Sequence, residues 1–383
     1  MRIRQGGLVK PKLNVLFYGA PGCGKTTQAL EIAKFHREDG TPFRVWIFDA
    51  ESGGTDEVLE ELENQGVDTR NIFVAYTQSL SEVELYVNKI AKKEELYLLN
   101  DDGSESDDLI TDAYGKPFVP DAVIVDGTSV LKLTTTQSLL QLSQKRNKIK
   151  AKNNGASAEE VYVATQNAGL EIKDYSQLAY NCQRLVLSLM ALPLHVILTA
   201  REKDETVSAK ENGQFVSTPT GKKIPDSFKG IDYNCKTIIR MFRNDSDEVC
   251  YSVEKDRTKT FEVGDVVVNP SLLAFEETLN KGAGRKEFSI RNDLDDAIQK
   301  DKEIFEKEVL GDIADDTVPD NKDNTSIDSL IDSINEVMRN LSQADRDKKK
   351  AALASASLPA TPVAIKKVTD IETLTKILNI IKA

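Results

Sequence analysis

Short apolar runs alternate with helix-like segments from residue 13 to about residue 270. The apolar runs predict strands at 13–18, 43–49, 71–75, 121–126 and 194–200. The segments between them predict helices at 24–38, 54–66, 79–93, 128–150 and 174–192. This alternation is typical of a mostly parallel sheet with helices on both faces, so we expect an α/β core.

Two of the runs have the continuous apolar pattern that is typical of central parallel strands. They read Asp121-Ala122-Val123-Ile124-Val125-Asp126, apolar between its two acids, and Leu194-His195-Val196-Ile197-Leu198-Thr199. A polar, turn-rich segment over 97–120 predicts a surface hairpin. The later apolar runs predict antiparallel strands at 213–218, 236–242, 248–254 and 265–268.

The composition changes after about residue 285. Residues 291–350 contain 17 acidic and 10 basic residues, a net charge of −7 out of −12 for the whole chain. Charged segments that are poor in aromatic residues form solvated helices and loose linkers. We therefore divide the chain into a core at 1–285, an acidic linker at 286–324 and a small helical module at 325–383.

The module is predicted from an apolar stripe and a helix start. The stripe consists of Ile327, Leu330, Ile331, Ile334, Met338 and Leu341. Thr369-Asp370-Ile371-Glu372 has the pattern of a capping box ahead of another apolar helix. Two or three such helices either pack as a mini-domain or form a frayed tail, because so small a core is marginal alone.

A glycine-rich loop follows the first predicted strand and precedes the first predicted helix. It has the spacing G-x-x-x-x-G-K-[ST] of a phosphate-binding loop, or P-loop. Glycines let the backbone turn its N–H groups toward a phosphate, and Lys25 supplies a positive charge. The loop predicts binding of ATP, with Thr26 as a ligand of Mg²⁺. The candidate phosphate-binding residues are Gly19, Pro21, Gly22, Cys23, Gly24, Lys25, Thr26 and Thr27.

Three polar residues end predicted strands, and open α/β sheets bind their ligands at that edge. Asp126 ends a buried strand and is the candidate acid that supports Mg²⁺. The next residue is Gly127, so the group that activates water must come from elsewhere, and Glu51 is the best candidate. Thr199 is placed to sense the γ-phosphate. The alternatives are that Glu51 is a surface acid that caps a helix and that Thr199 only ends a strand.

Lys255 and Arg257 lie two residues apart on a segment that reads as a strand. Side chains at that spacing point to the same face of a strand. Such cations complete a phosphate site when they come from a neighbouring subunit, as an arginine finger does. The alternative is a solvated, charged edge strand.

Composition argues against several other kinds of site. The four cysteines are scattered, without a C-x-x-C pair, and only two histidines are present, so we expect no zinc site. No apolar stretch has the length of a membrane span, and the first residues lack the apolar run of a signal peptide. We therefore expect a cytoplasmic protein without a membrane partner. The net charge of −12 argues mildly against a nucleic-acid partner.

Several motifs together resemble one family. Phe48-Asp49-Ala50-Glu51, Val123-Ile124-Val125-Asp126 and Lys255-x-Arg257 follow the P-loop in the order and spacing of RecA-fold recombinase ATPases. The chain is most similar, over about residues 10–275, to the short RecA-like ATPases of bacteriophages, the Sak-type single-strand-annealing group of phage AAA-family nucleotide-binding proteins. The resemblance implies a RecA-like P-loop NTPase core, Glu51 as the water-activating glutamate, and Lys255 and Arg257 as cations that act in trans.

The resemblance also implies a homo-oligomeric ring or filament, ATP at subunit boundaries and binding of single-stranded DNA. We therefore expect a DNA-stimulated ATPase of recombination or replication in the cytoplasm of a bacterial host. The alternative is a nucleotide-gated interaction ATPase, such as a helicase loader or assembly chaperone, whose C-terminal helices bind a protein; the acidic balance favours it. The run Lys145-Arg146-x-Lys148-x-Lys150-x-Lys152, in an insert at 134–173, either contacts phosphates or is the exposed face of a helix.

Overall fold

The computed structural model describes most of the chain. It covers residues 10–280 except 52, 101–102 and 212–213, then 285 and 301–302, and 327–382 except 342, 362–363, 366–367 and 369. The chain divides into two compact units, residues 1–94 with 111–299 and residues 95–110 with 300–383. Nearly all of the predicted acidic linker lies outside the described residues, so the domain limits at 285 and 324 stay a prediction.

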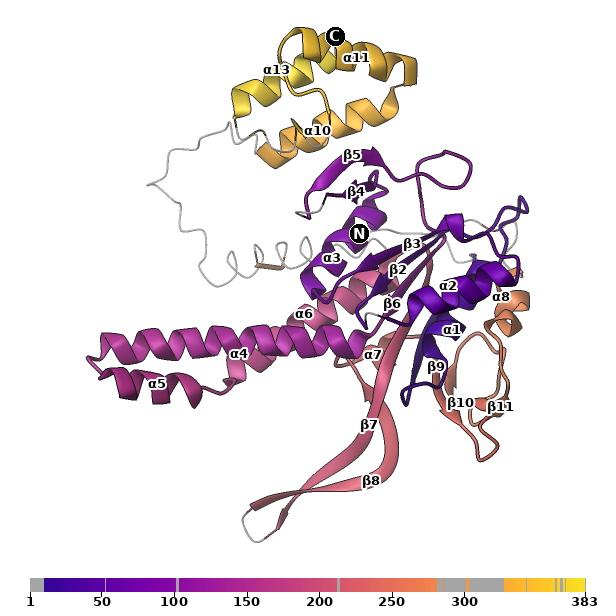
Figure 1. The fold of residues 1–383 in the computed structure, drawn as a ribbon, viewed down its shortest axis with the longest axis vertical. Helices are drawn as coiled ribbons and strands as arrows, with labels where there is room; N and C mark the ends of the chain where they lie inside the picture. Colours follow the sequence, from indigo (N-terminus) through magenta and orange to yellow (C-terminus); the bar gives the residue numbers. More distant parts are fainter. Residues whose placement is uncertain are drawn as a thin grey trace. The chain divides into compact units, whose positions relative to one another are not determined.

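A central sheet of nine strands organises the described part of the first unit (Figure 1). Its order is β11-β10-β9-β1-β7-β6-β2-β3, and β8 pairs with β7 alone. Every pairing from β9 to β3 is parallel, whereas β8, β10 and β11 are antiparallel to their neighbours. The mostly parallel α/β sheet predicted for the core is confirmed. The strands are β1 (Asn14–Gly19), β2 (Val45–Asp49), β3 (Ile72–Tyr76), β6 (Ala122–Asp126), β7 (His195–Glu211), β8 (Gln214–Asp226), β9 (Thr237–Arg243), β10 (Val249–Asp256) and β11 (Val266–Val268).

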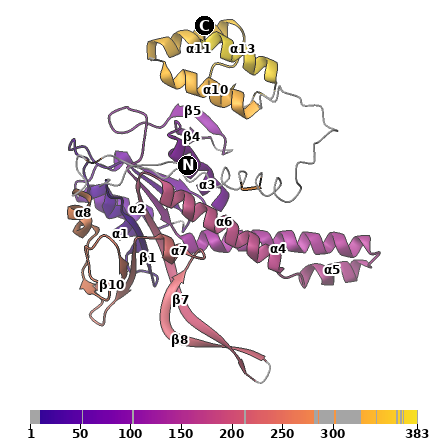
Figure 2. The same ribbon diagram turned by 180° about the vertical axis from the view of Figure 1, so that it is seen from behind.

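Helices cover both faces of this sheet (Figures 1 and 2). Apolar residues of β1, β2 and β6, such as Phe17, Ile47 and Ile124, pack against Leu30 and Leu62 on one face. The helical elements on that face are α1 (Lys25–Leu30), the 3-10 turn η1 (Glu31–Lys34), α2 (Thr55–Asn64) and α8 (Glu276–Asn280). The helices on the other face are α3 (Leu80–Lys92), α4 (Thr128–Asn153) and α6 (Ile172–Ala191). The remaining short elements are η2 (Thr69–Asn71), α5 (Ala158–Gln166), α7 (Ile231–Asn234) and η3 (Leu272–Phe275).

Strand register brings the predicted polar residues to one edge. Asp49 pairs with Asp126 between β2 and β6. Phe17 pairs with Thr199 between β1 and β7, and β7 separates β1 from β6. Because these strands are parallel, their carboxyl ends and the P-loop share the carboxyl edge of the sheet.

Two predictions about strands are wrong. First, β9 is parallel to β1 and extends the parallel part of the sheet, although the sequence suggested an antiparallel strand. Second, β7 does not end near Thr199: it continues to Glu211 and forms a long antiparallel ribbon with β8. Residues 202–211 are mostly polar because the ribbon leaves the core, so the hydrophobic pattern gave no sign of it.

The helix predicted at 24–38 is also too long. The α-helical part ends at Leu30, and a 3-10 turn follows to Lys34. Phe35 is extended, with φ −77° and ψ 154°, and its carbonyl accepts a bond of 2.9 Å from the Phe43 N–H. The chain therefore turns back so that the rings of Phe35 and Phe43 both lie in the core, 5.9 Å apart. This tertiary contact overrides the local helical pattern.

The second unit contains a hairpin and the C-terminal helices. Apolar side chains on three helices share a core, in which Leu330 and Ile334 pack with Leu374 and Ile377. These helices therefore pack around one core in the structure. Asp370 caps the last helix, because its carboxylate accepts a bond of 2.8 Å from the Thr373 N–H. The elements are β4 (Tyr97–Leu99), β5 (Glu105–Leu109), α10 (Ile327–Asn340), α11 (Gln343–Ser355) and α13 (Ile371–Lys382).

Candidate active site

The P-loop lies between β1 and α1 at the carboxyl edge. Gly24, just before α1, has φ 83° and ψ 22°, a left-handed conformation that glycine adopts without strain. The Lys25 side chain is buried within the loop, and its Nζ donates to the carbonyl oxygens of Ala20 at 2.8 Å and Gly19 at 3.2 Å. The loop therefore holds one ammonium group at its centre, as a phosphate-binding loop requires.

Other loop residues differ in their exposure. Pro21 and Gly22 are exposed at the tip, and Thr27 is half-buried. Cys23 is buried, and its thiol donates to the Ala20 carbonyl at 2.9 Å. Burial raises the pKa of the Cys23 thiol. A protonated, buried thiol is a poor nucleophile, so Cys23 packs the loop.

Asp126 lies at the centre of a hydrogen-bonded group of polar side chains. Its carboxylate accepts from the Thr26 hydroxyl at 2.8 Å and from the Thr199 hydroxyl at 2.5 Å. Thr199 Oγ1 in turn accepts from the Gly127 N–H at 2.8 Å. Thr199 is buried and both roles of its hydroxyl are used, so it orients Asp126 and fixes the start of α4 in this conformation. Its predicted role as a phosphate sensor stays a prediction.

Burial sets the electrostatics of this group. Asp126 is only 3% exposed, and burial raises the pKa of its carboxyl, while the two threonine hydroxyls oppose that shift. A buried carboxylate without a cationic partner is costly to ionise. The donor set of one carboxylate and one hydroxyl suits Mg²⁺, which keeps several waters and binds the phosphates of its nucleotide rather than an all-protein cage.

Glu51 lies beside Gly127, close to Asp126. A Cβ added to Gly127 would lie 2.6 Å from Cγ of Glu51, so the Glu51 side chain occupies the space that a side chain at 127 would need. Gly127 also has φ 94°, which a glutamate would adopt only with strain. The structure thus explains why no acid follows Asp126: a carboxylate reaches that place from the end of β2 instead.

The backbone and one cation fix Glu51. Its N–H donates to Oδ1 of Asp49 at 2.9 Å, and Oδ2 of Asp49 accepts from the Thr55 hydroxyl at 2.7 Å. The Glu51 carboxylate accepts from Nε of Arg201 at 3.0 Å. Helix α2 begins at Thr55 without a side-chain cap, so Glu51 does not act as the helix cap of the alternative interpretation.

Lys255 and Arg257 lie at the opposite, amino edge of the sheet. Lys255 pairs with Ile238 near the start of β9, and its Nζ donates to the carbonyls of Asp232 and Tyr233 at the end of α7. The strand ends at Asp256 after a bulge, so the prediction that both cations share one face of a strand is wrong. Arg257 is exposed, and no bond from its guanidinium to a described residue is found. Neither cation can reach the P-loop of its own chain.

Comparison with known proteins identifies the family. A family model described as an AAA domain matches residues 11–265. The chain belongs to the AAA domain family. It is therefore a P-loop ATPase domain in its core. A search of curated proteins returns no match.

Solved structures include a similar one, a KaiC-like protein of the hyperthermophilic archaeon Pyrococcus horikoshii. It is 14% identical, and the alignment covers 67% of this chain and 89% of that one, with a TM-score of 0.35. The fold assignment depends on the sheet order and the P-loop described above.

Within this AAA domain, sequence reasoning missed Arg201 and Ser129. The Ser129 hydroxyl accepts from the Arg201 N–H at 2.8 Å and donates to the carbonyl of Asp226 at 2.5 Å. These contacts join the start of α4 to the base of the β7–β8 ribbon. Arg201 lies within β7, and its register against Gly19, which sets it beside the P-loop, depends on strand pairing that the sequence does not show.

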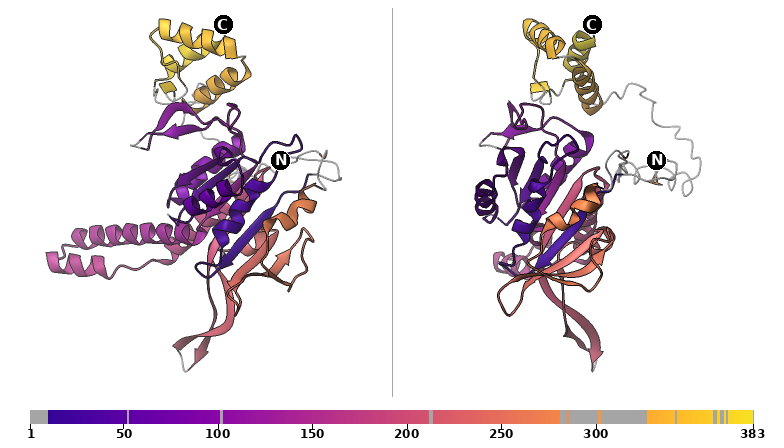
Figure 3. Two further views of the ribbon diagram at one scale, coloured as in Figure 1. Left: turned by 45° about the vertical axis from the view of Figure 1, so that its right-hand side comes forward. Right: turned by 90° about the vertical axis from the view of Figure 1, so that its right-hand side faces the viewer.

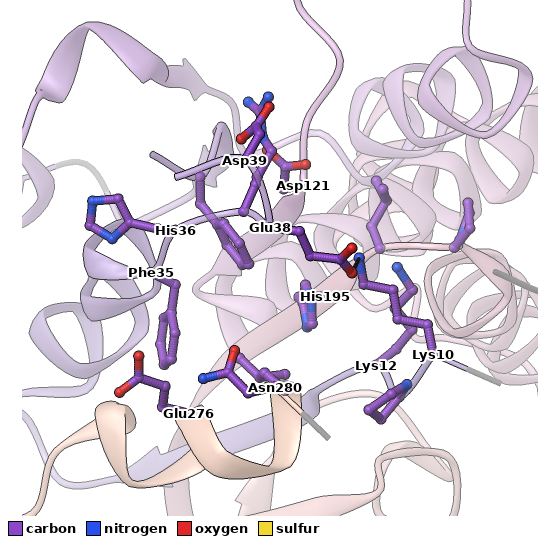
Figure 4. Close-up of a pocket in the computed structure, with 16 residues that line it drawn as sticks. Lys10, Lys12, Phe35, His36, Glu38, Asp39, Asp121, His195, Glu276 and Asn280 are labelled. Carbon is purple, nitrogen blue, oxygen red and sulfur yellow. Dashed lines mark hydrogen bonds and ion pairs between the residues drawn. The ribbon is translucent and has the colours of Figure 1, made fainter. Parts of the chain in front are cut away.

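A cavity of about 530 Å³ lies at the amino edge of the AAA domain (Figure 4). His195 lies in its lining, and Nδ1 of this residue accepts from the Leu13 N–H at 3.1 Å. Burial, with Lys12 and Lys10 nearby, lowers the pKa of His195 to about 3. The ring is therefore neutral, and the hydrophobic pattern had marked it only as part of a strand.

Two kinds of feature are absent from the described residues. In the part of the chain that the structure covers, no three histidine, cysteine or acidic side chains lie close enough together to hold a metal ion. None of the helices described is both long and apolar enough to cross a membrane.

Proposed function

We propose that this chain hydrolyses ATP with Mg²⁺ as a self-associating ATPase of DNA recombination or replication that binds single-stranded DNA. The observation that carries the proposal is the position of Glu51. Its side chain lies against Gly127, the residue after Asp126, at the edge of the sheet where a general base must stand to reach a water near the γ-phosphate. The resemblance to Sak-type phage ATPases supports the assignment to recombination.

The residues have distinct roles in this proposal. Lys25 and the loop amides bind the outer phosphates, and Thr26 and Asp126 hold Mg²⁺, which when bound neutralises the charge on the phosphates. Thr199 keeps Asp126 in position through its hydroxyl. Glu51 accepts a proton from water, and Asp49 and Arg201 hold it in place until then.

The proposed self-association is supported by the residues at the two edges of the sheet. Lys255 and Arg257 lie at the amino edge and the P-loop at the carboxyl edge, so these two cations can reach the phosphates only from another copy. A head-to-tail contact of this kind generates a ring or a filament. Arg257 is the better candidate, because Lys255 already binds the end of α7.

One experiment tests the proposal as a whole. We expect ATP turnover to rise when single-stranded DNA is added, and the oligomer mass to rise when ATP is added. Absence of single-stranded DNA binding at low salt would refute the DNA part, since phosphate contacts are strongest there.

A second candidate function is a nucleotide-gated switch that binds a protein. The C-terminal helices form a core of their own, and the chain has a net charge of −12. ATP-dependent capture of a host protein by the full chain, without any DNA effect on turnover, would favour this function.

A further inference from the structure

Helices α4 and α5 form an arm that projects from the sheet (Figures 1 and 3). Only the first turn of α4 is embedded in the core, where Thr128, Ser129, Val130 and Leu131 are buried. At a rise of 1.5 Å per residue, its 26 residues span about 39 Å. The arm therefore presents most of α4 outside the AAA core.

The inner side of the arm is fixed by specific contacts. The buried Ser143 hydroxyl donates to the Gly169 carbonyl at 2.7 Å. Arg146 donates to both oxygens of Asp174, at 2.6 and 2.8 Å. Arg146, one member of the basic run, thus holds α6 to the arm. Three lysines of the same run lie on the outer side of α4.

The outer side of α4 carries cations without acids. Lys145, Lys148 and Lys152 are spaced by three and four residues and therefore share one side of the helix. All three are exposed, and no ion pair to an acid of the described chain is found for them. Leu142 and Ile149 lie on the same side and are 47% and 50% exposed.

This charge differs from that of the rest of the surface. Helix α4 contains no acidic residue at all, whereas α2 contains five acidic residues and no basic one. In a chain of net charge −12, an acid-free helix with exposed lysines does not follow from average composition. A row of cations interleaved with apolar side chains matches a polyanion that also has apolar groups.

We propose that the outer side of α4, at Lys145, Lys148 and Lys152 with Leu142 and Ile149, binds the phosphate backbone of single-stranded DNA. The inference depends on the proposed function, for which it supplies the contact site. Single-stranded DNA fits because its phosphates match the lysines and its unpaired bases leave apolar faces that pack on Leu142 and Ile149.

The arm is joined rigidly to the nucleotide site. Helix α4 begins two residues after Asp126, and the Thr128 hydroxyl donates to the Thr199 carbonyl at 2.7 Å. DNA bound to the arm therefore acts on α4, the helix that follows directly on Asp126 and Gly127. This connection gives a physical route by which DNA alters turnover.

The test measures DNA affinity of the full chain against salt concentration. The variant is Lys145→Ala/Lys148→Ala, and the control is Lys92→Ala/Lys116→Ala, which removes two exposed lysines elsewhere. For single strands each lost phosphate contact lowers the slope of log K against log salt by about 0.7, so we expect a slope smaller by about 1.4 and affinity about tenfold weaker near physiological salt. The control is expected to bind like the wild type. Lys145→Arg/Lys148→Arg keeps the charge and should retain affinity even if the alanine variant folds poorly.

Each outcome decides a different question. If the wild type fails to bind single-stranded DNA at low salt, the proposed function fails and the arm with it. If the wild type binds and the alanine variant has the same affinity and slope, the arm is not the site, although the proposed function stands. If the substitutions abolish binding of a labelled polyglutamate peptide but leave DNA binding unchanged, the arm serves an acidic protein and our inference is wrong.

Discussion

The two edges of the central sheet differ in the charged side chains they carry and in how these are paired. At the carboxyl edge each acid has a partner within the chain: Asp126 accepts from two threonines and Glu51 from Arg201. At the amino edge cations gather, and burial together with Lys12 and Arg257 lowers the pKa of Lys236. One chain therefore organises the acids and hydroxyls of an ATPase site by itself, whereas Lys255 and Arg257 lie on the far side of the sheet. This difference supports the proposal that the site is completed by assembly.

The largest effect should come from the P-loop lysine. Lys25→Ala removes the only ammonium group held inside the loop, so we expect ATP affinity and turnover each to fall on the order of 100-fold or more. Lys92→Ala, a change of an exposed lysine outside the site, is the control for both measurements. Normal ATP binding by Lys25→Ala would show that the nucleotide binds elsewhere and that the carboxyl edge is not the nucleotide site.

Glu51→Gln separates chemistry from binding. Glutamine keeps the shape of the side chain but cannot take a proton, so we expect turnover to fall about 100-fold with ATP affinity nearly unchanged. Phosphate release and binding of a fluorescent ATP analogue measure the two quantities. Glu57→Gln, an exposed acid on α2, is the matched control. Full turnover in Glu51→Gln would require another base.

Asp126→Asn should stabilise the fold while it stops turnover. Burial raises the folded pKa of Asp126 above its ordinary value of 3.8, so the folded chain holds this proton at pH values where the unfolded chain has released it. Stability therefore falls as pH rises through the folded pKa, and the cost remains at pH 7. We expect a higher melting temperature for Asp126→Asn at pH 7 and a smaller difference at acidic pH. A lower melting temperature at pH 7 would show that the two threonine bonds outweigh burial.

Substitution of His195 at the amino edge should have a smaller effect on stability. The pH dependence that it removes should have the opposite sign to that of Asp126. The folded pKa of His195 is about 3, below its unfolded value of 6.5, so the contribution of His195 to stability is lost as pH falls below 6.5. The loss is about 1.4 kcal/mol for each pH unit. Urea unfolding between pH 7 and 5.5 should show a weaker pH dependence for His195→Gln. His36→Gln, at the only other histidine, should behave like the wild type.

Sequence reasoning found the parts that local patterns encode. The P-loop has a fixed spacing, and β1, β6 and the first part of β7 are apolar on both faces, so their order and their polar ends were readable. Register sets the end of β2 against Asp126, and the Glu51 side chain lies against Gly127. The sequence pattern could not place Arg257, because the bulge in β10 and the end of that strand at Asp256 depend on pairing with β9. The extension of β7 over 202–211 was missed because its residues are mostly polar and bury no core face.

The most direct test of the central claim is ATP turnover by a mixture of two inactive variants. Lys25→Ala lacks a working P-loop, and Arg257→Ala lacks the cation at the amino edge. If the site forms between copies, random mixing creates intact sites at about one interface in four, and we predict that about a quarter of wild-type turnover returns. A mixture of Lys25→Ala with the double variant Lys25→Ala/Arg257→Ala should stay inactive. If Arg257→Ala loses activity alone and mixing restores none of it, Arg257 does not act across a subunit boundary and the account is contradicted.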